Sequence, residues 1–159
     1  TVWENIMFKS LNLKSDEELI NDSQIFLKKV GLNKKDAHLY PSELSGGMKK
    51  RVAIARAIVM NPKYLFCDEP NSGLDPKTAI LIDNLINEIT EEYNITTVIN
   101  THDMNSVMEI GEKIVFLLNG KKAWEGTKKD IFNTENQAVS NFVYSSDLFK
   151  KVREMYLKR

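Results

Sequence analysis

The run Tyr64–Cys67 constrains the fold most, because every position in it is apolar. A strand that buries one face alternates apolar and polar residues. This run instead predicts a strand covered on both faces, as in a parallel α/β sheet. Two carboxylates, Asp68 and Glu69, follow it directly. Open α/β sheets bind ligands at the carboxyl ends of their strands, so both are candidate site residues. The alternative is an Asp-Glu pair that simply starts a solvated loop.

A second run, Ile95–Thr101, is rich in β-branched residues and predicts another buried strand, with His102 at its carboxyl end. A lone histidine is more often structural than functional, but this position at a strand end favours function. Between the two runs, Asp75 is placed to cap a helix and Pro76 suits its first position. The helix has one apolar stripe, made of Ile82, Leu85, Ile86 and Ile89.

Ser45 and the glycines Gly46 and Gly47 stand directly ahead of a helix that is predicted to run to about Met60. The Ser45 hydroxyl can accept a hydrogen bond from a first-turn amide. The glycines let a ligand approach the backbone closely, and bare amides at a helix N-terminus attract phosphate. The alternative is an ordinary capped helix after a turn. The lysines that follow, at positions 49 and 50, are interpreted as a solvated face.

The two ends of the chain are predicted to be mostly helical. Residues 1–40 include the capping box of Ser15 and Glu18, and Gly31 is a plausible helix stop. Asn119-Gly120 between two strand-like runs predicts a hairpin. The tail, residues 135–159, is either a partner-docking arm or a solvated terminal helix. Its candidate buried residues are Val139, Phe142, Val143, Leu148, Phe149 and Val152, and Thr127 with Asp130 is predicted to cap the helix before it.

Composition excludes several classes of protein. The chain carries 22 basic and 22 acidic residues, so no global field favours nucleic acid or an anionic membrane. Cys67 is the single cysteine, which excludes a disulfide framework, and it is interpreted as inert packing. No apolar run approaches the roughly 20 residues that span a bilayer. No signal peptide is visible, and a first residue of Thr1 rather than Met is typical of a fragment.

Leu44-Ser45-Gly46-Gly47 resembles the signature motif of the ATP-binding cassette (ABC) family, and the run 64–69 resembles its Walker B strand. The resemblance implies an α/β fold, a partial P-loop NTPase with a mostly parallel sheet, flanking helices and a helical subdomain. The helical subdomain with the signature helix would be residues 1–60, the catalytic core portion 61–134 and the helical tail 135–159.

The resemblance also implies roles for particular residues, with ATP and Mg²⁺ as cofactors. Asp68 would bind Mg²⁺, Glu69 would be the catalytic base and His102 would contact the γ-phosphate. The signature residues Ser45, Gly46 and Gly47 would bind the nucleotide held by a second subunit. The segment after Asn71 resembles the D-loop at the dimer interface, formed by Ser72, Gly73, Leu74 and Asp75.

One family motif is missing. No Gly-x-x-x-x-Gly-Lys-Ser/Thr sequence, the loop that cradles the β- and γ-phosphates, occurs in the 159 residues. Family cassettes are also longer. The resemblance therefore implies the C-terminal portion of a full ATPase, with its P-loop ahead of residue 1.

As a function, the resemblance implies an ATP-hydrolysing subunit of an ABC transporter at the cytoplasmic face of the inner membrane. Its partners would be a second copy of itself, an integral membrane permease and a small regulatory subunit, with no nucleic acid. Met48, where many relatives carry Gln, and Val139-x-x-Phe142 look most like the Mla or toluene-tolerance phospholipid transporters. Asn71 departs from the Thr common in the family. The alternatives are a non-catalytic interaction module, an importer or exporter with another cargo, and a soluble repair or translation ATPase.

We expect the purified 159-residue chain to show negligible Mg²⁺-dependent ATPase activity, because it contains no phosphate-binding loop. A phosphate-release assay measures this. Turnover above that of a Glu69→Gln variant of the same chain would contradict the expectation.

Overall fold

The computed structural model describes residues 1–145 and 150–151. These residues form two compact units, which divide between Thr101 and His102. The division follows contacts rather than motifs, so the subdomain boundaries expected at residues 60 and 134 stay a prediction. Among the described residues, no helix has the length and apolar character to cross a bilayer.

The first unit begins with short helices. They are α1 (Val2–Ile6), η1 (Phe8–Ser10), α2 (Asp16–Lys29), η2 (Lys34–His38) and η3 (Pro41–Glu43). The capping box predicted for α2 is confirmed, because the Glu18 amide donates to the Ser15 hydroxyl and the Ser15 amide donates to the Glu18 carboxylate. The predicted stop is also confirmed, since α2 ends just before Gly31 at a φ of +67°.

The arginine at position 51 joins α2 to the helix that follows the signature residues, α3 (Gly46–Ile58). Its Nη1 donates to the carbonyl oxygens of Val30 and Gly31, each at 3.3 Å. Cations stabilise the C-terminal end of a helix, where the last carbonyls lack partners. Arg51 therefore ties α3 to the end of α2.

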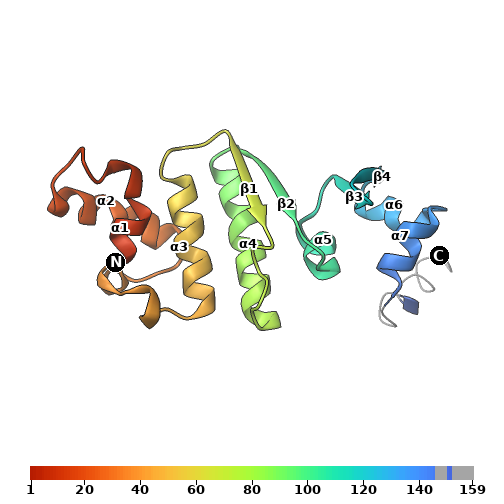
Figure 1. Cartoon of the computed structure of the whole chain (residues 1–159), viewed down its shortest axis with the longest axis horizontal. Helices are drawn as coiled ribbons and strands as arrows, with labels where there is room; N and C mark the ends of the chain where they lie inside the picture. The colour runs from red at the N-terminus through yellow and green to blue at the C-terminus, as the bar shows by residue number, and fades with distance from the viewer. Residues whose placement is uncertain (146–149, 152–159) are drawn as a thin grey trace. The chain divides into compact units, whose positions relative to one another are not determined.

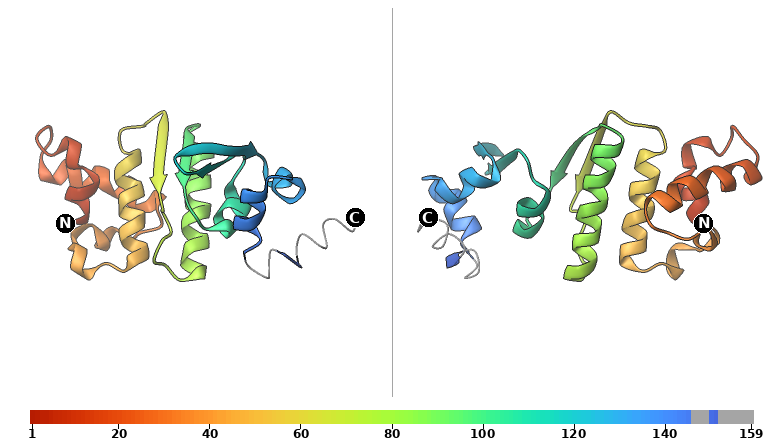
Figure 2. Two further views of the ribbon diagram at one scale, coloured as in Figure 1. Left: turned by 45° about the vertical axis from the view of Figure 1, so that its right-hand side comes forward. Right: turned by 180° about the vertical axis from the view of Figure 1, so that it is seen from behind.

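The rest of the first unit is a strand–helix–strand arrangement (Figure 1). Strand β1 (Tyr64–Asp68) is followed by α4 (Pro76–Glu92) and β2 (Thr96–Asn100). The two strands pair in parallel, with Tyr64 opposite Thr96 and Asp68 opposite Asn100. The views of Figure 2 show α4 alongside the strand pair. Both predicted strands and the predicted helix are thus confirmed.

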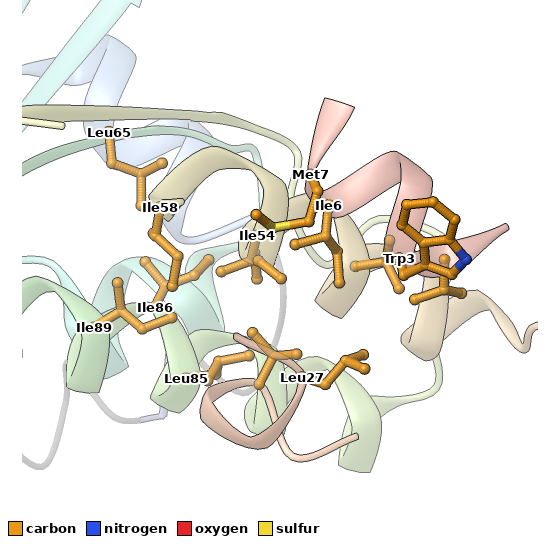
Figure 3. Packing of buried hydrophobic residues seen from close by; sticks show 14 of the residues in the cluster. Trp3, Ile6, Met7, Leu27, Ile54, Ile58, Leu65, Leu85, Ile86 and Ile89 are labelled. Carbon is orange, nitrogen blue, oxygen red and sulfur yellow. The ribbon is translucent and has the colours of Figure 1, made fainter. Parts of the chain in front are cut away.

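The hydrophobic core of this unit joins the N-terminal helices to the strands through α3. Figure 3 shows Ile54 and Ile58 of α3 among side chains of the first helix, of α4 and of β1. The labelled core residues around these two are Trp3, Ile6, Met7, Leu27, Leu65, Leu85, Ile86 and Ile89. The stripe predicted for α4 from its spacing is buried as expected.

The burial expected for β1 and β2 on both faces is wrong for this unit. Leu65 is 5% exposed, whereas Tyr64 is 62% and Phe66 is 75% exposed. Val98 of β2 is also exposed. Strand side chains point alternately to the two faces of a sheet, and the helical core covers the face that holds Leu65. The apolar side chains on the other face, those of Tyr64, Phe66 and Val98, are therefore left largely exposed in this unit.

The second unit holds α5 (Met104–Ile110), β3 (Ile114–Leu118), β4 (Lys121–Gly126), α6 (Lys128–Asn133) and α7 (Gln137–Val143). The predicted hairpin is confirmed, because β3 and β4 pair antiparallel and both turn residues have positive φ, +51° at Asn119 and +72° at Gly120. The Thr127–Asp130 cap is confirmed as well. The core of this unit consists of Ile131, Phe132, Val139, Val143 and Tyr144.

The predicted tail is only partly described. Phe142, expected to be buried, is 42% exposed and packs against Phe116 with ring centroids 5.4 Å apart. Leu148, Phe149 and Val152 lie outside the described residues.

Candidate functional site

The start of α3 has the geometry expected of a capped phosphate-binding helix terminus. The Met48 amide donates to the Ser45 hydroxyl at 3.2 Å, and Ser45 itself is extended, with φ −64° and ψ 163°. Ser45 and Gly46 are exposed. An exposed N-terminus with unpaired first-turn amides is suited to bind an anionic oxygen.

Gly47 also has a packing role that its sequence context did not predict. It is buried, and a Cβ built on it would lie 2.7 Å from Cγ2 of Thr78 in α4. A Cβ on Gly46 would lie 3.2 Å from Cδ2 of Leu74. The two glycines therefore allow the start of α3 to pack closely against the loop before α4 and against the first turn of α4. Side-chain-free positions permit such an approach.

The predicted metal ligand Asp68 lies at the carboxyl end of β1, directly opposite Asn100. The Asn100 amide donates to Oδ1 of Asp68 at 2.7 Å. Asp68 is exposed, so its Oδ2 can bind a hard cation or a water held by one, and carboxylate oxygens are the ligands that Mg²⁺ prefers. Asn100 was not singled out from the sequence, although a polar residue at a strand end pointed to it.

Glu69 adopts a left-handed backbone conformation, with φ +46°. For a residue other than glycine this conformation costs about 1–2 kcal/mol. Its amide donates to the Asn100 carbonyl at 2.9 Å. Its carbonyl accepts from the Ser72 amide at 3.2 Å and from Nζ of Lys50 at 2.9 Å. The sequence reading of Lys50 as part of a solvated face is therefore wrong, because this half-buried side chain reaches back to the candidate base.

The loop after Glu69 is anchored to α4. Nδ2 of Asn71 lies 3.3 Å and 3.2 Å from the carboxylate oxygens of Asp83, and both residues are buried. Asn71 thus lies next to a carboxylate in α4. Buried polar groups of this kind are stabilising only when hydrogen-bonded.

The four predicted dimer-interface residues follow as a turn. Gly73 has a φ of +78°, which suits glycine, and Leu74 is the half-buried member. Asp75 caps α4, since the Thr78 amide donates to its Oδ1 at 3.0 Å. Hydrogen bonds from the Thr78 hydroxyl and amide hold the pKa of Asp75 below its ordinary value. Ser72 and Asp75 are exposed, as an interface with another chain requires.

His102 follows β2 after Thr101 and opens the second unit. The next residue, Asp103, caps α5 by accepting from the Asn105 amide at 2.9 Å. Asp68, Glu69 and Asn100 are brought together within the first unit, and His102 lies two positions beyond Asn100 in the chain.

Burial raises the pKa of the Cys67 thiol, which keeps it protonated and fits its interpretation as packing.

Comparison with known proteins identifies relatives along almost the whole chain. The family described as "ABC transporter" matches residues 1–72. A methionine import ATP-binding protein of Carboxydothermus hydrogenoformans is 50% identical and one of Bacillus subtilis is 41% identical. These matches cover 99% and 90% of this chain but only 47% and 42% of the relatives. The chain thus spans less than half the length of these relatives.

Two solved structures share the fold. The ATP-binding cassette MJ0796, described as a dimer bound to ADP and Pi, is 36% identical with a TM-score of 0.68, over 80% of this chain and 56% of that one. The cbiO1 protein of Clostridium perfringens is 33% identical with a TM-score of 0.71, over 89% and 57%. These likenesses confirm the predicted α/β P-loop NTPase fold. The relatives do not support the expected phospholipid-transporter branch.

The close packing of Gly47 makes a prediction about stability. Gly47→Ala places a methyl group against Thr78, and we expect the free energy of unfolding to fall by about 1–3 kcal/mol, as for overpacked cores. Urea denaturation of the full-length protein measures this. Thr78→Ser removes the opposing methyl but keeps the hydroxyl that bonds Asp75.

The double variant Gly47→Ala/Thr78→Ser should therefore regain most of the lost stability. The matched control is Thr78→Ser alone, which we expect to change stability by less than about 1 kcal/mol. A double variant as unstable as Gly47→Ala would contradict the packing explanation.

Proposed function

Because the chain belongs to the ABC transporter ATPase family, we propose that it is part of a subunit that binds and hydrolyses ATP to drive transport. One observation carries this proposal. The two carboxylates at the end of β1 and the capped, exposed start of α3 lie in one compact unit and are joined by the bond between Lys50 and Glu69. The acidic strand end suits a hard cation and a general base, and the helix terminus suits a phosphate, which in the dimer proposed below belongs to the ATP of the other copy.

In this proposal Glu69 is the general base. Its carboxylate orients a water and accepts a proton as the water oxygen attacks the γ-phosphorus of ATP and ADP leaves. Asp68 would hold Mg²⁺, directly or through water, with its orientation set by Asn100. When bound, the metal ion neutralises charge on the phosphate oxygens. His102 would donate a hydrogen bond to the γ-phosphate.

The start of α3 would serve a second copy of the subunit. Ser45 and Gly46 are exposed, and they would bind the phosphates of the ATP held by that copy, together with the backbone of Gly47. Ser72, Gly73, Leu74 and Asp75 would line the contact between the copies. The dimeric MJ0796 cassette supports this arrangement. We further propose that the dimer docks to an integral membrane permease at the cytoplasmic face of the membrane.

The cargo proposed here is methionine or a similar small amino acid, taken up by an importer. The support is the identity of 41% and 50% to methionine import ATP-binding proteins of two organisms. This replaces the phospholipid cargo expected from Met48 and from the Val139-x-x-Phe142 segment. Cargo is bound by the membrane partner, so the ATPase sequence bears on it only through relatedness.

We expect Glu69→Gln in the full-length protein to lower the rate of ATP hydrolysis by at least about a hundredfold, because the amide cannot accept the proton of the attacking water. ATP binding should be retained, since the change preserves shape. Phosphate release and the binding of a fluorescent ATP analogue measure the two properties. The matched control is Glu88→Gln, an exposed residue of α4.

Unchanged turnover in Glu69→Gln would exclude this residue as the base. A full-length protein that neither binds nor hydrolyses ATP would instead favour the non-catalytic interaction module.

For the cargo, we expect the full-length protein, reconstituted with its permease in lipid vesicles, to take up radiolabelled methionine in an ATP-dependent manner. The Glu69→Gln variant in the same vesicles should abolish uptake and is the control for leakage. Hydrolysis without methionine uptake would refute the cargo while leaving the ATPase assignment intact.

A further inference from the structure

We infer that Lys50 is a positioning residue, which holds the backbone of Glu69 so that its carboxylate can act on water; this rests on the proposed function. Lys50 lies one turn into α3, after the Ser45 cap. Its Nζ donates to the Glu69 carbonyl at 2.9 Å, across 19 residues of sequence. Nothing in the sequence motif around Lys50 assigns it a ligand, and the structure gives it this contact.

The backbone of Glu69 needs such support because of its conformation. Its φ of +46° is uncommon for a residue with a side chain, and such residues persist only where their surroundings hold them. On the amide side the Asn100 carbonyl accepts at 2.9 Å. On the carbonyl side the donors are the Ser72 amide at 3.2 Å and Lys50. The contacts come from β2, from the loop after β1 and from α3.

The Lys50 contact differs from the other two because its donor is a side chain, and because that side chain belongs to a helix rather than to the strand ends. The Asn100 contact continues the pairing of β1 with β2, and the Ser72 contact is a turn hydrogen bond, so both involve backbone atoms only. A charged donor makes a stronger hydrogen bond to a carbonyl than a neutral one does. The bond therefore fixes the direction of the Glu69 carbonyl relative to α3, and with it the direction in which the side chain leaves the strand end.

The neighbouring lysine provides a comparison within the same helix. Lys49 is exposed, whereas Lys50 is half-buried. The two carry the same charge one position apart, so a change at either alters the net charge of α3 equally. If Lys50 acts by positioning Glu69, only a change at Lys50 should affect hydrolysis. If the lysines act through their charge on the nucleotide, changes at Lys49 and at Lys50 should have similar effects.

The test measures ATP hydrolysis by the full-length protein. Lys50→Met retains the length of the side chain without the donor, and Lys50→Arg retains a donor. We expect Lys50→Met to lower kcat about tenfold while KM for ATP changes less than about twofold, because misplacing a catalytic group affects the transition state more than ground-state binding. Because Lys50→Arg retains a charged donor, its kcat should stay within about threefold of the value for the parent protein. Lys49→Met should match the parent protein.

A double-mutant cycle separates positioning from loss of folding. In a Glu69→Gln background there is no base to misplace, so Lys50→Met should change the residual rate less than about twofold. An equal drop in both backgrounds would overturn the inference, even if Lys50→Met melts at a lower temperature. An unchanged kcat in Lys50→Met, or a failure of Lys50→Arg to rescue, would overturn it as well.

The outcomes for the two proposals are distinct. If Glu69→Gln does not affect hydrolysis, the assignment of the base fails. If Glu69→Gln abolishes hydrolysis and Lys50→Met leaves kcat unchanged, only the positioning role fails.

Discussion

The parallel pairing of β1 with β2 is the constraint on which the site depends. It places Asp68 opposite Asn100. The side-chain amide of Asn100 then donates to the Asp68 carboxylate, and the backbone carbonyl of Asn100 accepts from the Glu69 amide. Parallel strands need a crossover, and α4 supplies it while burying the stripe that covers one sheet face. Without this register the Asp68 carboxylate and the Glu69 amide would each lose the hydrogen bond to Asn100.

Two unlike contacts join the first turns of α3 to the rest of the unit, one to α4 and one to the residue that follows β1. One is steric, since the glycine at position 47 lets the helix approach Thr78 of α4. The other is polar, from Lys50 to the Glu69 carbonyl. Together they join an exposed anion-binding terminus to an acidic strand end. Gly47 is therefore needed for packing within its own subunit, in addition to the proposed contact of its backbone with the nucleotide of another copy.

Local elements were predictable because their signals are local. The caps at Ser15, Ser45 and Asp75 and the Asn119-Gly120 turn each act within a few residues, and the structure contains all of them. Hydrophobic spacing likewise predicted the helix between the strands. The two-sided burial of β1 was predicted wrongly, because an apolar run reports what a strand can bury and not which neighbours are present. The branch of the family was also predicted wrongly, because a motif of a few residues does not distinguish transporters with different cargoes.

The sequence by itself determined the order of strand, helix and strand, the helix starts and the identity of the acidic pair, since propensity, capping and apolar spacing depend on near neighbours. Only the tertiary structure decided that Asn100 orients Asp68, that Lys50 leaves solvent for the Glu69 carbonyl, and that Asn71 lies beside Asp83. Each of these contacts joins residues 12 to 32 positions apart. No local pattern specifies such pairs, because the backbone path of the whole unit decides which side chains meet.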